Sequence, residues 1–85
     1  MRFVDTAINT ELRFSIGQEI ESGRYYLSIP VSNRLCDYEE YYVISRDEHD
    51  AYPSDLLALR EFAGQCRERR HDHLLYLQPG SDRGV

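Results

Sequence analysis

The amino-acid sequence predicts a small α+β domain, in which a three- to four-stranded, mainly antiparallel sheet is covered by one principal amphipathic helix. Two observations favour this class. Hydrophobicity alternates residue by residue in several segments between positions 12 and 44, and its period changes to three and four residues after position 55. With 85 residues, of which 41% are hydrophobic and 29% charged, we expect one domain over 1–85 with a flexible tail at 78–85.

The first predicted hairpin joins two strands of alternating hydrophobicity. Leu12, Phe14 and Ile16 share one face of the first strand, and the second strand has its own apolar face, formed by Tyr25, Leu27, Ile29 and Val31. The polar connector at 21–23 ends in Gly23, which can adopt the positive φ of a tight turn. Pro30 lacks an N–H, so we expect the second strand to be exposed there or to end soon afterwards. The first ten residues suit a helix and a strand equally well.

A third strand is predicted over residues 38–44, where aromatic and β-branched residues are dense. Alternate positions divide it into two faces, one with Tyr38, Glu40, Tyr42 and Ile44 and the other with Glu39, Tyr41 and Val43, so neither face is purely apolar.

Ser45 and Glu48 fit the S-x-x-E capping box, which predicts a helical turn that Pro53 interrupts. The main helix is expected at about 55–70, with an apolar stripe of Leu56, Leu59, Phe62, Ala63 and Cys66. A short final strand is expected over 74–77.

The composition excludes several classes of function. Fifteen acidic residues against ten basic ones leave a net charge of −5, the wrong sign for a protein that grips nucleic-acid backbones. All ten basic residues are arginine, so no lysine is available for a Schiff base or a phosphate-binding loop. No apolar run approaches the ~18 residues that cross a bilayer. We therefore expect no nucleic acid, no membrane and no cofactor as partners.

The two cysteines and the beginning of the chain indicate a cellular compartment. Cys36 and Cys66 lie far apart without a C-x-x-C pair, and the chain does not open on a charged segment followed by an apolar one. These features predict a cytoplasmic protein in which both cysteines are reduced, small and buried.

The strongest functional signal is an acidic stretch rich in tyrosine between residues 37 and 55. It contains seven acidic residues and a single basic one, Arg46. Carboxylates steer a basic partner during association, and tyrosine offers a large contact area with few torsions to freeze. We therefore predict that ten residues bind a basic protein surface: Asp37, Tyr38, Glu39, Glu40, Tyr41, Tyr42, Asp47, Glu48, Asp50 and Tyr52. The alternative is that some of the tyrosines pack in the core while the carboxylates only solvate an outer face.

Two clusters are weaker candidates for catalysis or metal binding. Glu39 and Glu40 are adjacent on a strand and point to opposite faces, so they cannot converge on one atom. His71, Asp72 and His73 could serve a small hydrolase, but zinc sites normally show paired short spacings, and a basic helix end already explains the arginines nearby. We expect no metal ion and no enzymatic activity. The alternatives are a homodimeric structural or regulatory subunit that pairs through a sheet edge, and a hydrolase that uses the histidine cluster.

Three segments carry a resemblance to bacterial proteins: YYLSIPVSN at 25–33, DYEEYY at 37–42 and PGSDRG at 79–84. With its size and acidity, the chain resembles small uncharacterised bacterial proteins and, more loosely, the acidic single-domain immunity proteins that accompany polymorphic bacterial toxins. The resemblance implies stoichiometric inhibition, in which the protein covers the basic active site of a toxin. It transfers no functional residue to this chain.

Overall fold

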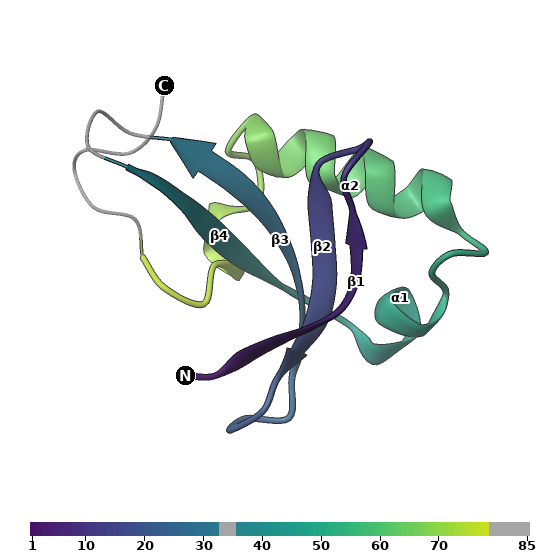
Figure 1. Ribbon diagram of the computed structural model, residues 1–85, viewed down its shortest axis with the longest axis horizontal. Helices are drawn as coiled ribbons and strands as arrows, with labels where there is room; N and C mark the ends of the chain where they lie inside the picture. The colour runs from purple at the N-terminus through teal and green to yellow at the C-terminus, as the bar shows by residue number, and fades with distance from the viewer. Residues whose placement is uncertain (33–35, 79–85) are drawn as a thin grey trace.

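One antiparallel sheet and one main helix dominate residues 1–32 and 36–78, which are the residues that the computed structural model describes. The strands follow one another across the sheet as β1 (Phe3–Asn9), β2 (Phe14–Glu19), β3 (Tyr25–Ser32) and β4 (Asp37–Ile44). The helices α1 (Arg46–Asp50) and α2 (Leu56–Arg67) come next, and the 3₁₀ turn η1 (Asp72–Leu74) follows (Figure 1). The predicted α+β class with an antiparallel sheet and one principal helix is confirmed.

One face of the sheet forms the main core with α2. The strands contribute their apolar positions to it: Phe14, Ile16, Leu27, Ile29, Tyr42 and Ile44. From α2, Leu59, Ala63 and Cys66 pack on this face at the predicted spacing, and each is at most 3% exposed. A buried side chain of this kind contributes about 1.5–3 kcal/mol, so this layer holds the helix to the sheet.

The predicted hairpin, third strand and helices are confirmed with changes at their ends. Leu12 belongs to the turn before β2, and β3 continues through the exposed Pro30 and ends two residues later. The capping box of α1 is complete, because Ser45 Oγ accepts from the Glu48 N–H at 3.0 Å while Glu48 Oε1 accepts from the Ser45 N–H at 2.8 Å. The helix α2 ends at residue 67, before the predicted position 70.

Two segments differ from the sequence predictions. The first ten residues contain a strand, because β1 pairs with β2 along its whole length, with a bulge between Asp5 and Ala7. The final strand predicted over 74–77 is wrong, since among the described residues of this segment only Leu75 forms a bridge, to Tyr42 in β4. The predicted tail falls outside the described residues except for Gln78. No helix in the described ranges is long and apolar enough to span a membrane.

The second face of the sheet, opposite α2, is concave. Phe3 of β1 stacks on Tyr41 of β4 with ring centroids 3.8 Å apart, although β1 and β4 are the two outer strands of the described sheet. Strands lie about 4.8 Å apart, so a flat sheet would separate these two by about 14 Å. The contact therefore requires the sheet to curl toward this side, and Figure 1 shows the start of β1 crossing the other strands.

Candidate functional site

The ten residues of the predicted binding stretch are distributed over three parts of the molecule. Alternation along β4 sends Asp37, Glu39 and Tyr41 to the concave face and Tyr38, Glu40 and Tyr42 to the helix face. The remaining four, Asp47, Glu48, Asp50 and Tyr52, lie in or just after α1. The two face assignments within β4 match the alternation read from the sequence. The structure does not bring the ten residues together on one surface.

Two of the ten residues, Glu40 and Tyr42, have side chains that are buried beneath the surface of the folded chain. Tyr42 is 0% exposed and Glu40 is 6% exposed. The Tyr42 hydroxyl donates to Glu40 Oε1 at 2.9 Å and lies 3.4 Å from the Cys66 carbonyl oxygen. A buried carboxylate needs such donors because its desolvation is costly. The pair therefore satisfies polar atoms between β4 and α2.

The residues around α1 have local structural contacts. Glu48 completes the capping box, and Asp50 lies 2.8 Å from His49 Nδ1 and 3.4 Å from Arg46 Nε. The hydrogen bond from His49, followed by the Arg46 charge, lowers the pKa of Asp50. Tyr52 is half-buried, with its ring edge-on to Phe14 at 6.1 Å. Glu48 and Asp50 thus make local contacts at the two ends of α1, Tyr52 packs on Phe14, and Asp47 is exposed.

The concave face is the strongest candidate for a binding site. We define it as the strand side chains that point away from α2, namely Phe3, Asp5, Ile8, Ser15, Gly17, Glu19, Tyr26, Ser28, Pro30, Ser32, Asp37, Glu39, Tyr41 and Val43. Four of these residues are acidic and none is basic. Asp5, Asp37 and Glu39 are exposed, whereas Glu19 is buried and accepts from the N–H groups of Arg2, Glu21 and Ser22. The acidic groups that remain exposed give this face a negative potential.

Aromatic rings close one end of the concave face. Tyr26 is 0% exposed, because Phe3 and Tyr41 pack edge-on against its ring at 5.3 and 5.0 Å. Its hydroxyl donates to the Asp5 carboxylate. Burial and this hydrogen bond raise the pKa of Tyr26. Gly17 lies beneath the ring, where a Cβ atom would approach the Tyr26 hydroxyl oxygen to 2.5 Å. A glycine is therefore required for the tyrosine to reach Asp5.

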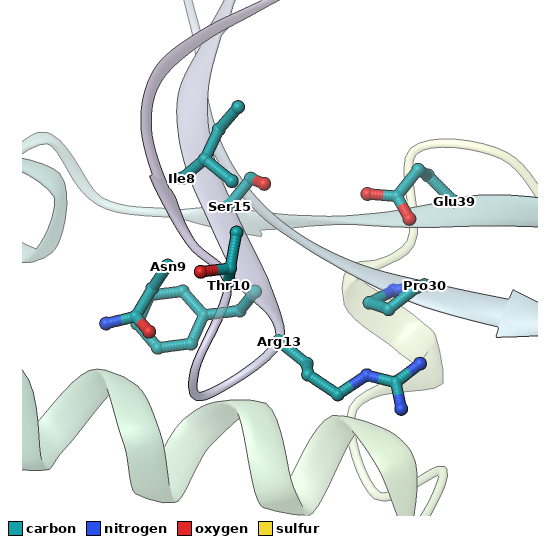
Figure 2. Close-up of a pocket in the computed structure, with 8 residues that line it drawn as sticks. Ile8, Asn9, Thr10, Arg13, Ser15, Pro30 and Glu39 are labelled. Carbon is teal, nitrogen blue, oxygen red and sulfur yellow. The ribbon is translucent and has the colours of Figure 1, made fainter.

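A cavity of about 260 Å³ occupies the other end of the concave face, beside the β1–β2 turn (Figure 2). Eight residues line it: Ile8, Asn9, Thr10, Arg13, Phe14, Ser15, Pro30 and Glu39. Figure 2 shows the Ser15 hydroxyl and the Glu39 carboxylate pointing into it from opposite sides. The cavity therefore combines apolar walls with two oxygen groups that can accept hydrogen bonds.

Electrostatic coupling links the cavity to the rest of the concave face. The pKa of Glu39 is raised, chiefly because the neighbouring strands partly desolvate its carboxylate and further by the negative charge of Asp5. The Ser28 hydroxyl, which donates to Glu39 Oε1 at 3.2 Å, opposes the shift. Burial, Glu39 and Asp5 also raise the pKa of Tyr41. The negative charge of Asp5 thus disfavours the charged form of Glu39, and a cation bound beside Glu39 would oppose this effect.

The histidine cluster after α2 makes packing contacts. His71 Nε2 lies 2.7 Å from Gln65 Oε1, and its ring stacks on Phe62 with centroids 4.7 Å apart. The rings of His71 and His73 are 6.0 Å apart. Within the described ranges no group of three His, Cys, Asp or Glu side chains is arranged to hold a metal ion. The contacts of His71 hold the turn after α2 against that helix.

The cysteines differ in their surroundings. Cys66 is buried in the main core, and burial raises the pKa of its thiol to about 12, which leaves the thiol protonated and unreactive at neutral pH. Cys36 is exposed and immediately precedes β4. The prediction that both cysteines are buried is therefore confirmed for Cys66 and wrong for Cys36.

Sequence reasoning missed the cavity residues that β1 and β2 contribute. Ile8 and Asn9 lie in the segment whose secondary structure was ambiguous, and Ser15 was assigned only as the polar side of a strand. Alternation could have placed Ser15, Ser28 and Glu39 on one face, but the curl that brings β1 toward β4 has no signal in the sequence. Comparison of the chain with protein-family models, curated proteins and solved structures found no match. Function is therefore inferred from the geometry alone.

Proposed function

We propose that the protein is a small, acidic, cytoplasmic protein-binding module of the immunity or antitoxin type, which covers a basic surface of a partner protein such as a toxin. The observation that carries this proposal is the concave face, with Asp5, Asp37 and Glu39 exposed and no basic residue among its strand positions. Charge complementarity of this kind steers association with a basic partner and disfavours acidic ones.

Apolar groups beside the carboxylates support protein binding over simple solvation. Ile8 is 63% exposed next to the cavity, and Pro30 is exposed on the opposite wall. Tyr41 is half-buried and its ring is held by stacking on Phe3. A rigid aromatic ring loses little entropy when a partner covers it. The concave face thus offers apolar contact area within a negative field.

Pairing of two copies through a sheet edge is less favoured. β1 is an outer strand of the described sheet, and its ladder is broken by the bulge between Asp5 and Ala7. Bulges twist an edge away from further strands and are a common protection against edge pairing. At the other edge, the Tyr76 N–H donates to the Tyr41 carbonyl at 3.0 Å, so part of β4 is already paired.

Capture from the lysate of source cells, followed by an affinity measurement, tests the proposal. The double variant Asp37→Asn/Glu39→Gln removes two charges from the concave face, and the control Glu61→Gln/Glu68→Gln removes two exposed charges from α2 and its C-cap. We expect the concave-face variant to bind the captured basic protein at least about tenfold more weakly, and the control within about twofold of the native chain. Equal losses in both variants, or a captured partner that is acidic, would overturn the proposal.

A further inference from the structure

The size of the cavity on the concave face limits what it can hold. Its volume of about 260 Å³ lies below the roughly 300–1,000 Å³ typical of pockets for drug-sized ligands. A molecule of liquid water occupies about 30 Å³, so the cavity is large enough for several water molecules. It therefore fits one long side chain or a small fragment better than a nucleotide or an organic cofactor.

An unused hydroxyl group faces the cavity. Ser15 is only 8% exposed, and its side chain has no hydrogen-bond partner among the described residues. Figure 2 shows its oxygen directed into the cavity, across from the Glu39 carboxylate. Ser28 donates to one carboxylate oxygen of Glu39, Oε1, which leaves Oε2 available to a ligand. No buried side-chain oxygen of the described residues lacks a hydrogen-bond partner, so the Ser15 oxygen is reached by solvent through the cavity, and a ligand there can replace the water that it binds.

The walls and charges of the cavity select a cationic group on an apolar stem. Ile8 and Pro30 offer apolar surface on opposite sides of the cavity (Figure 2). Arg13 is the one basic residue in the lining, and its side chain extends beneath Pro30 toward α2, away from Ser15 (Figure 2). The oxygen groups that face the cavity therefore lack a cation of their own.

We infer that the cavity receives the side chain of an arginine from the partner protein, with its guanidinium group donating to Glu39 and Ser15 and its methylene groups lying between Ile8 and Pro30. The inference rests on the proposed function, because the arginine belongs to the basic surface that the concave face covers. A guanidinium group is favoured over an ammonium group because its planar fork can donate to two separated acceptors at once and sheds water more readily.

Titration with short peptides, followed through the backbone amide resonances of the ¹⁵N-labelled protein, tests the inference without the partner. The probe is the acetylated tripeptide amide glycyl-arginyl-glycine, and the neutral control replaces arginine with citrulline. We expect the arginine peptide to shift the amides of Ile8, Ser15 and Glu39 with a dissociation constant of about 1 mM, and the citrulline peptide to bind at least about tenfold more weakly.

Variants assign the binding to the two oxygen groups. Glu39→Gln and Ser15→Ala should each weaken binding of the arginine peptide at least threefold, whereas Glu61→Gln on α2 should leave it unchanged. A third peptide, with lysine in place of arginine, tests the preference for a guanidinium group. Binding of the citrulline or lysine peptide as tight as that of the arginine peptide, or amide shifts that persist in both cavity variants, would overturn the inference. If the arginine peptide does not bind, while the Asp37→Asn/Glu39→Gln variant still binds the captured partner more weakly than the native chain, the arginine site is refuted and the proposed function stands. If the arginine peptide binds as expected, but the Glu61→Gln/Glu68→Gln control loses as much affinity for the captured partner as the concave-face variant does, the proposed function fails instead.

Discussion

Replacement of Gly17 by alanine tests how closely the aromatic end of the concave face is packed. A Cβ atom at this position would lie 2.5 Å from the Tyr26 hydroxyl oxygen and 2.7 Å from its Cζ, and closer still to the Val4 carbonyl oxygen. The tyrosine ring could swing aside, at the cost of its hydrogen bond to Asp5. The Val4 carbonyl belongs to the backbone of β1, so β1 itself would have to move.

The expected cost follows from two opposing effects. Overpacking in a closely packed site destabilises by about 1–3 kcal/mol, whereas exchange of glycine for alanine stabilises by about 0.4–1 kcal/mol through the unfolded chain. The steric effect is larger, and we expect Gly17→Ala to lower the free energy of unfolding by about 2 kcal/mol. In a domain of this size such a loss lowers the Tm by about 8–16 °C.

Gly64→Ala is the matched control within the same chain. Gly64 lies inside α2, and a Cβ atom there would meet nothing within 4 Å. Alanine has the higher helix propensity by about 1 kcal/mol, so we expect this variant to raise the Tm. Thermal unfolding followed by circular dichroism and urea titration measure both changes. A Gly17→Ala variant as stable as the native chain, or two variants that shift in the same direction, would refute the packing described for Tyr26.

Two further predictions concern buried oxygen groups. Backbone N–H donors, chiefly that of Arg2, lower the pKa of Glu19 to about 2 from an ordinary 4.5, so the carboxylate stabilises the fold above pH 4.5 and this contribution is lost as the pH falls toward 2. The Tm of Glu19→Gln should therefore depend less on pH between 5 and 2 than the Tm of the native chain or of the control Glu21→Gln. Plots of Tm against pH that run parallel for all three proteins would contradict this. Tyr42→Phe removes the hydroxyl that donates to Glu40, and we expect it to lower the free energy of unfolding by about 1–3 kcal/mol in urea titration. Tyr38→Phe is the control and should lower it by less than about 0.5 kcal/mol. Equal losses in the two variants would show that the buried hydrogen bond contributes nothing to stability.

Local patterns were sufficient for most of the elements. The alternation in β2, β3 and β4 gave each residue its correct face, because successive side chains on a strand point to opposite sides. Ser45 and Glu48 marked the start of α1, since the capping box forms between residues three apart. The strand prediction over 74–77 was wrong because Leu74 and Leu75 cover the core beside β4 without forming a strand.

The candidate site depended on contacts that no local pattern contains. Sequence alone determined that the chain is acidic, that aromatic and acidic residues gather in its middle, and that they alternate along one strand. The tertiary structure decided that Tyr42 and Glu40 are buried under α2, and that Glu39 meets Ser15 and Ile8 around a cavity. The physical reason is that the curl of the sheet depends on how Phe3, Tyr26 and Tyr41 pack together. These rings come from three strands, and only the folded chain brings them into contact.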